Sequence, residues 1–209
     1  MSAEFQEDAD RQRSQMLQQQ VDRFYRHYAG LTSKGEAAFF AEKFLFDPAF
    51  LDQSREIYPE LVPILLVRDP RDMICSILAF NARRGTADFL QEEGDTDTKL
   101  VAKYAPILDR VAEWWQQHSR SCILLHYEDL VVSPVPTLAR LFSRLDLEIS
   151  SRDIVSIIRA VEACGSNDRH MTADSVNKSI GRWRSEMSLS AAELSRSKYH
   201  AFLEIFEYE

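Results

Sequence analysis

An arginine placed directly after an apolar run is the part of this sequence best suited to do chemistry. Residues 61–67 are mostly aliphatic and β-branched, which predicts a buried strand, and Arg68 stands at its carboxyl end. Asp69 can cap the helical pattern that follows, and Pro70 suits its first position. Ser76 then lies about 9 Å along the helix axis from Pro70, at about 1.5 Å per residue. A cation and a hydroxyl beside a helix N-terminus can hold an anion such as a phosphate.

The same residues also have a purely structural interpretation. Arg68 could form a strand-end ion pair with Asp69 or Asp72, and Ser76 could be a small residue that lets two helices pack. Asp69 and Asp72 themselves suit the first turn of a helix better than catalysis. We favour anion binding, because a strand-end arginine and an inward-facing serine are unfavourable choices where nothing binds.

This segment resembles the 3′-phosphate-binding segment of the sulfotransferases that use 3′-phosphoadenosine 5′-phosphosulfate (PAPS). Three further segments resemble that family and occur in its order. They are the Glu-Lys within residues 41–43, the Tyr-Glu-Asp-Leu within residues 125–130 and the Gly-Arg-Trp-Arg within residues 175–187. Each match alone is weak, whereas the four together cover residues 36–190 and make the resemblance specific.

The resemblance implies both a fold and an activity. The fold is an α/β domain of the P-loop NTPase-like type, a helix-rich parallel sheet with crossover helices, here without its first strand. Strands that alternate with helices along the chain favour a parallel sheet independently. The activity is transfer of a sulfuryl group from PAPS, the co-substrate, to a hydroxyl or amine, and no metal is implied.

The resemblance also assigns roles to single residues. Arg68 and Ser76 would bind the 3′-phosphate. Lys43 would point at the bridging or sulfuryl oxygens, and Glu42 is the nearest candidate base for the acceptor proton, with a surface ion pair as its alternative. The carboxyl-terminal segment would add contacts to the nucleotide from Ser175, Asn177, Lys178 and Gly181.

The chain departs from the family in two places. Members hold the 5′-phosphosulfate on a Gly-, Ser- and Thr-rich loop after their first strand, but residues 30–35, which have suitable residue types, follow a helical pattern. Some members carry an Arg-Lys-Gly triplet in the carboxyl-terminal segment, whereas this chain has Val-Asn-Lys at residues 176–178. The chain is therefore either the downstream part of a longer sulfotransferase or a degenerate, non-catalytic relative that binds a 3′,5′-bisphosphate nucleotide without turnover.

Helical and loop patterns predict how the chain is organised. We expect one domain over residues 1–209, incomplete if the chain is a fragment, with an amphipathic helical lead-in over 1–35. Only 61–67 and 121–127 read as strands, so an apolar sheet edge should need cover from the lead-in, an upstream segment or a second copy in a homo-oligomer. The acidic stretch 85–98 is either a lid near the acceptor or, as we favour, a solvated connector. Further helices are expected over 98–118, from 133 onward, over 150–164 and over 190–206.

Composition argues against several other classes. The formal net charge of −8 disfavours an open nucleic-acid surface, because such binding needs many phosphate contacts. A kinase-like protein ranks last, since the sequence has no GxxxxGK[ST] motif. The three cysteines are widely spaced, which favours buried thiols in a reducing compartment over a disulfide or a metal site.

The sequence also bears on the cell compartment of the protein and on the class of its acceptor. No apolar run approaches the roughly 20 residues of a membrane span, so we expect a cytoplasmic protein, provided that no targeting segment is missing. The acceptor would be a small molecule, a carbohydrate or a peptide, selected by the variable loops of the fold.

Overall fold

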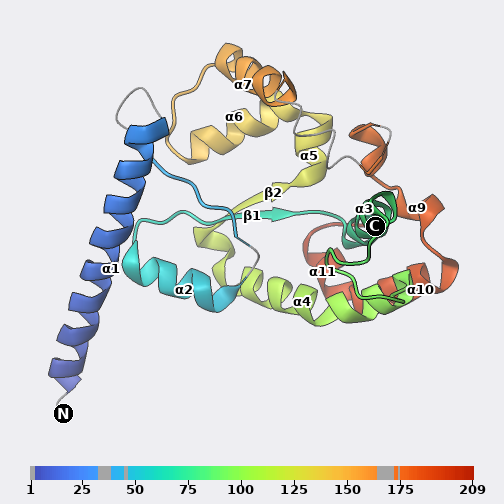
Figure 1. The fold of residues 1–209 in the computed structure, drawn as a ribbon, viewed down its shortest axis with the longest axis horizontal. Coiled ribbons are helices and arrows are strands. Elements are labelled where there is room, and N and C mark those ends of the chain that lie inside the picture. Colours follow the sequence, from blue (N-terminus) through green and yellow to red (C-terminus); the bar gives the residue numbers. More distant parts are fainter. Residues whose placement is uncertain (1–2, 33–38, 45–46, 164–171, 174) are drawn as a thin grey trace. The chain divides into compact units, whose positions relative to one another are not determined.

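The computed structural model describes residues 3–32, 39–44, 47–163, 172–173 and 175–209. The chain divides into two compact units, Met1–Leu61 and Val62–Glu209. Figure 1 shows helices in both units, while the described strands belong to the second.

The first unit contains two described helices. Helix α1 spans Ala3–Thr32, and helix α2 spans Pro48–Ile57. Asp47 begins α2, because its carboxylate accepts a hydrogen bond from the Ala49 N–H at 3.1 Å. Of the run 30–35, residues 30–32 belong to the end of α1, and 33–35 lie outside the described residues.

Aromatic contacts and one hydrogen bond hold α1 against the chain that follows it. The rings of Tyr25 and Phe40 stack with their centres 4.2 Å apart. The Tyr58 hydroxyl, just after α2, donates to the Asp22 carboxylate at 2.9 Å. Burial, assisted by this carboxylate, raises the pKa of Tyr58 to about 12, so the hydroxyl keeps its proton at neutral pH.

Two parallel strands form the sheet of the second unit. Strand β1 (Ile64–Val67) pairs with strand β2 (Ile123–His126), with Val67 opposite His126. Both strands are shorter than predicted, because only these residues pair and residues 119–121 form a 3-10 turn. The expectation of a helix-rich α/β protein with a parallel sheet is confirmed at this level of detail.

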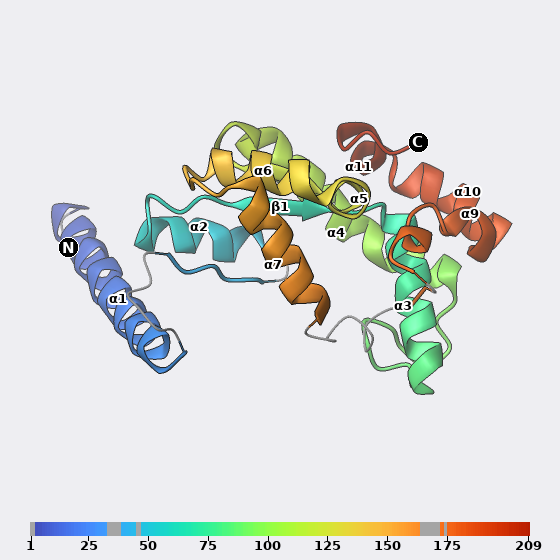
Figure 2. The same cartoon turned by 90° about the horizontal axis from the view of Figure 1, so that it is seen from above.

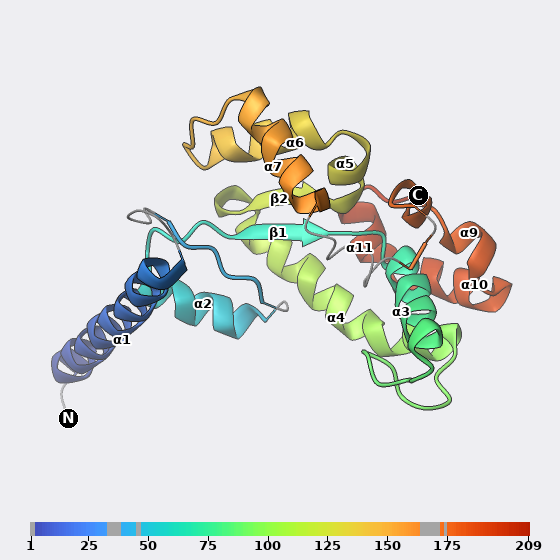
Figure 3. The same cartoon turned by 45° about the horizontal axis from the view of Figure 1, so that its top comes forward.

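Helices surround the strand pair. The described α-helices of the second unit are α3 (Pro70–Arg84), α4 (Asp97–His118), α5 (Tyr127–Val132), α6 (Pro134–Arg144), α7 (Ser151–Ala163), α9 (Trp183–Glu186), α10 (Leu189–Lys198) and α11 (His200–Ile205). In Figures 1 and 3, α4 lies on one side of the strands and α5 to α7 lie on the other. At the carboxyl end of β1, Figures 1 and 2 show α3 together with α9, α10 and α11. This end of the sheet carries the predicted anion site.

The core follows the apolar side of α4. Leu100, Val101 and Trp114 are among its buried residues, as the helical spacing predicts. On the sheet, Ile64 and Leu66 are 43% and 53% exposed. Because alternate residues of a strand share one face, one face of β1 carries exposed apolar side chains, and the expected cover of the sheet edge stays a prediction.

The single helix predicted over 190–206 is wrong, because α10 and α11 are separate helices. Tyr199 divides them, with backbone angles of φ −103° and ψ 8°. Tyr199, Phe202 and Phe206 are all buried, and both helices pack against α4. The spacing 199, 202 and 206 follows one helical face, which explains the burial of all three rings, whereas the division at Tyr199 is not apparent from that pattern.

Candidate functional site

Helix α3 begins directly after β1, and its first turn organises the predicted site. Asp69 accepts a hydrogen bond from the Arg71 N–H at 2.9 Å, and Pro70 occupies the first turn as predicted. Asp69 also forms a buried ion pair with the Arg71 guanidinium at 2.8 Å. The Asp69 carboxylate is thus occupied by the helix cap and by Arg71, rather than by Arg68.

The Arg68 guanidinium lies between two segments that are distant in the sequence. Its Nη2 donates to the Ser179 carbonyl oxygen at 2.9 Å. Its central carbon lies 4.5 Å from the centre of the Tyr127 ring, a cation–π distance. Its Nε is buried and has no hydrogen-bond partner within the described part of the chain. Since a guanidinium carries five N–H donors, Arg68 can still donate to a ligand.

A buried carboxylate fixes the carboxyl-terminal segment, which here comprises the described residues 172–173 and 175–187, to α3. Asp72 is 1% exposed and accepts hydrogen bonds from the backbone N–H groups of Gly181 at 2.6 Å and Trp183 at 2.9 Å. Burial raises the pKa of Asp72, and the two backbone donors oppose part of that rise. Glycine suits position 181, because its φ of 70° lies in the left-handed region that a residue with a Cβ rarely adopts. Asp72 is therefore an anchor, a role that its place in a first helical turn did not predict.

Ser76 reaches the same segment through another hydroxyl. Its Oγ lies 2.9 Å from Thr172 Oγ1. Thr172 Oγ1 in turn accepts a hydrogen bond from Arg182 Nη1 at 2.8 Å. Arg182 is 6% exposed and forms an ion pair with Glu186 at 2.7 Å. Ser76 and Arg68 thus both contact the carboxyl-terminal segment, but through different residues.

The other predicted nucleotide contacts lie on this segment. Ser175, Asn177 and Lys178 are exposed, and Asn177–Ser179 forms a 3-10 turn. The Ser179 hydroxyl lies 2.9 Å from the Tyr127 hydroxyl, which ties the turn to the end of β2. The side chains of Asn177 and Lys178 are therefore exposed, while the last residue of the turn, Ser179, is buried and held by Tyr127.

Tyr127, the tyrosine of the Tyr-Glu-Asp-Leu match, lies at the candidate site, a role that sequence reasoning did not assign to it. It touches both the Arg68 guanidinium and the Ser179 hydroxyl. A usable signal existed, because two parallel strands end at the same edge of a sheet. With Val67 opposite His126, the next residues are Arg68 and Tyr127.

The predicted catalytic residues, Glu42 and Lys43, belong to the first unit. Both are exposed on the segment 39–44, between α1 and α2. The structure brings together Arg68, Ser76 and the carboxyl-terminal segment in the second unit, and it does not relate them to Glu42 or Lys43. Among the described residues, no group of three or more His, Cys, Asp or Glu could hold a metal ion.

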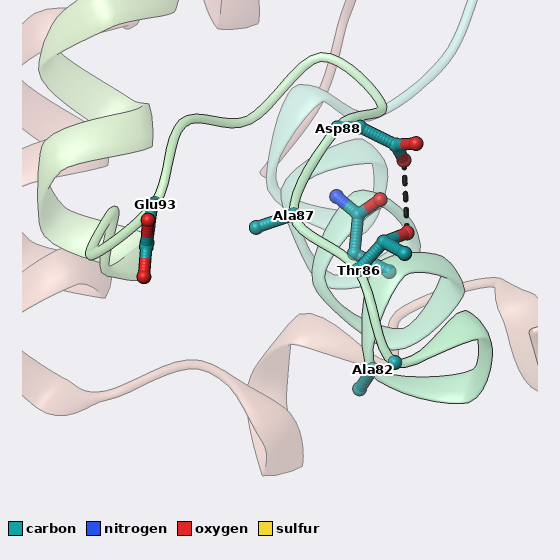
Figure 4. Close-up of a pocket in the computed structure, with 7 residues that line it drawn as sticks. Ala82, Thr86, Ala87, Asp88 and Glu93 are labelled. Atoms are coloured by element: carbon teal, nitrogen blue, oxygen red, sulfur yellow. Dashed lines mark hydrogen bonds between the residues drawn. The ribbon is translucent and has the colours of Figure 1, made fainter.

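A separate hollow lies beside the stretch that joins α3 to α4. Figure 4 shows it, lined by Asn81, Ala82, Gly85, Thr86, Ala87, Asp88 and Glu93. The buried Asn81 amide donates to the Phe89 carbonyl oxygen at 2.9 Å and to Gln91 Oε1 at 2.7 Å. These bonds fix the loop to α3. Whether this stretch, 85–98, is a connector or a lid near the acceptor stays a prediction.

Comparison with known proteins adds a family assignment. Residues 1–151 match a family model described as the sulfotransferase family. The matched residues include β1, α3 and β2, and the carboxyl-terminal segment lies beyond them. No curated protein and no solved structure matches the chain. Within the described ranges, no helix is long and apolar enough to cross a membrane.

Proposed function

Since the chain belongs to the sulfotransferase family, we propose that it binds PAPS and transfers its sulfuryl group to a hydroxyl or amine acceptor. Sulfuryl transfer in general follows from the family, whereas the donor nucleotide and its place on this chain are the proposal. The observation that carries it is Arg68, a half-buried guanidinium at the carboxyl end of β1 with an unpartnered Nε among the described residues.

We assign the 3′-phosphate of the donor to Arg68 and Ser76. A phosphate only accepts hydrogen bonds, and a guanidinium offers it paired donors as well as charge. The Arg68 Nη2 gives one N–H to the Ser179 carbonyl oxygen, and the two terminal nitrogens together carry four, so donors remain for a phosphate. The Ser76 hydroxyl, on the second turn of the helix that begins at this strand end, adds a further side-chain donor.

The carboxyl-terminal segment supplies the remaining donor contacts in this proposal. They come from Ser175, Asn177, Lys178 and Gly181, as the family resemblance implies. Two contacts of the segment support the assignment: Asp72 holds it at Gly181 and Trp183, and Arg68 holds it at the Ser179 carbonyl. A segment that is already fixed loses less conformational freedom when it binds a ligand.

The transfer step needs positioning, charge near the migrating group and a base. The acceptor oxygen or nitrogen forms a bond to sulfur, the bond from sulfur to the bridging phosphate oxygen breaks, and adenosine 3′,5′-bisphosphate leaves. The acceptor proton passes to the base. We assign the base to Glu42 and stabilisation of the bridging and sulfuryl oxygens to Lys43, on the family resemblance alone. On the same ground, we propose that β1 and β2 belong to a P-loop NTPase-like sheet.

Adenosine 3′,5′-bisphosphate tests the donor site, because it carries the 3′-phosphate and is the expected product. At a hundred times its Kd it should stabilise the folded chain by about 2.7 kcal/mol, seen as a rise in melting temperature. Arg68→Ala should abolish most of this rise. The control Arg110→Ala, which removes an exposed arginine of α4, should leave it intact. An undiminished rise in Arg68→Ala would remove Arg68 from the site.

A transfer assay separates the enzyme from a non-catalytic nucleotide-binding module. The chain is incubated with radiolabelled PAPS and a panel of hydroxyl and amine acceptors. Transfer of the label that depends on Lys43 supports the proposed activity. Tight nucleotide binding with no transfer to any acceptor would favour the binding module instead.

A further inference from the structure

Three polar side chains form a continuous chain of contacts from the carboxyl-terminal segment to α3. Arg182 Nη1 donates to Thr172 Oγ1 at 2.8 Å, and Thr172 Oγ1 lies 2.9 Å from Ser76 Oγ. Arg182 Nη2 also donates to the Thr172 carbonyl oxygen at 3.2 Å. Arg182 is buried and paired with Glu186. Arg182 therefore holds both the carbonyl oxygen and the hydroxyl of Thr172, and that hydroxyl also contacts Ser76.

The direction of the first link in this chain is certain, because a guanidinium can only donate hydrogen bonds. Thr172 Oγ1 must accept from Arg182, and its own hydrogen is left to donate. A hydroxyl that accepts from a cation becomes a better donor, since successive hydrogen bonds polarise one another. This favours a bond in which Thr172 donates to Ser76 over the reverse.

The direction of the second link decides what Ser76 can offer to an anion. If Ser76 donated to Thr172, its lone pairs would face an approaching phosphate, and phosphate oxygens cannot donate to them. If Ser76 accepts from Thr172, its own hydrogen stays available for the anion. The hydroxyl is then a donor oriented before the ligand arrives, which is the arrangement that binding favours.

We propose that Thr172, held by Arg182, orients the Ser76 hydroxyl as a donor to the 3′-phosphate of the nucleotide. The inference rests on the proposed function, because it concerns how the same site recognises that phosphate. Thr172 acts through Ser76 and is a positioning residue. The charge of Arg182 is balanced by Glu186, so its contribution is the direction of the hydrogen bonds rather than a long-range attraction.

Calorimetric titration with two nucleotides tests this orientation. Thr172→Val keeps the shape of the side chain and removes its hydroxyl. We expect it to weaken binding of adenosine 3′,5′-bisphosphate about five- to tenfold, the effect of about one hydrogen bond. Binding of adenosine 5′-monophosphate should not change, because this nucleotide lacks the phosphate that Ser76 would contact. Thr172→Ser should restore most of the lost affinity.

A double-mutant cycle shows whether Thr172 acts through Ser76. In a Ser76→Ala background, Thr172→Val should cause no further loss of affinity. Equal losses for both nucleotides, or the same loss in the Ser76→Ala background, would overturn the inference, because Thr172 would then only support the segment. If Arg68→Ala and Ser76→Ala weaken binding of adenosine 3′,5′-bisphosphate but Thr172→Val does not, the inference about Thr172 is overturned. The proposed function would then still stand. A lack of binding by the unaltered chain would overturn both.

Discussion

The substitution Asp72→Asn tests whether one buried carboxylate fixes the carboxyl-terminal segment. It keeps the size of the side chain but replaces two acceptor oxygens with one oxygen and one NH₂ group. Both oxygens are used in the structure, since Oδ2 accepts from the Gly181 N–H at 2.6 Å and Oδ1 from the Trp183 N–H at 2.9 Å. The amide must therefore point a donor at one of two backbone donors.

The expected magnitude follows from one lost hydrogen bond and one backbone N–H left without an acceptor. A buried donor without a partner costs about 1–3 kcal/mol. Burial raises the pKa of Asp72, which means that the charged form is disfavoured in the folded state, and removal of the charge offsets part of the loss. We therefore expect Asp72→Asn to lower the free energy of unfolding at neutral pH by about 1–2 kcal/mol.

Urea denaturation with linear extrapolation measures this difference. Asp109→Asn, on the exposed side of α4, is the matched control and should change the free energy of unfolding by less than about 0.5 kcal/mol. The affinity of Asp72→Asn for adenosine 3′,5′-bisphosphate should also fall, because the segment that carries the proposed contacts is then held less firmly at Gly181 or Trp183. A free energy of unfolding equal to or above that of the unaltered chain would refute the reasoning, since burial of the charge would then outweigh both bonds.

Three further predictions concern other buried or paired groups. Tyr199→Phe should leave the free energy of unfolding unchanged or raise it by up to about 1 kcal/mol, because the buried Tyr199 hydroxyl has no partner among the described residues; a clear loss in urea denaturation would contradict this. Burial alone would raise the pKa of Asp97, but hydrogen bonds from Ser188 and Thr98 lower it below the ordinary 3.8. The stability that ionised Asp97 contributes is therefore present above pH 3.8 and lost as the pH falls through the lowered pKa. Asp97→Asn should accordingly be less stable at neutral pH, by no more than about 0.5–1 kcal/mol because solvent screens this partly exposed carboxylate, and indistinguishable in strong acid; an equal gap at both pH values would show the sign to be wrong. Burial raises the pKa of Cys75 to about 12, so its thiol should resist iodoacetamide in the folded chain and react in urea; mass spectrometry that finds rapid labelling of the folded chain would refute this.

Local signals in the sequence were sufficient to place the starts of two helices, α3 at the site and α6 beyond β2. The Asp69-Pro70 and Ser133-Pro134 pairs predict the starts of α3 and α6, which begin where expected. Capping and proline effects act within one helical turn, so a short stretch of sequence carries the whole signal. The lengths of β1 and β2 depend on which residues pair across the sheet, and a single strand does not contain that information.

The contacts that assemble the site join residues far apart in the chain and could not be predicted in the same way. Asp72 meets Gly181 across 109 positions, and Arg68 meets Ser179 across 111. Hydrophobic periodicity predicts which face of a helix is buried, but not which distant polar group will meet it. The break at Tyr199 was missed for the same reason, because it depends on how α10 and α11 pack against α4.

The central claim is that Arg68 and Ser76 converge on the 3′-phosphate of a sulfate-donor nucleotide. A crystal structure of the chain with adenosine 3′,5′-bisphosphate tests it most directly. We predict 3′-phosphate oxygens within hydrogen-bond distance, about 2.7–3.2 Å, of both the Arg68 guanidinium and Ser76 Oγ. A nucleotide bound elsewhere, or one whose 3′-phosphate points away from both side chains, would contradict the claim.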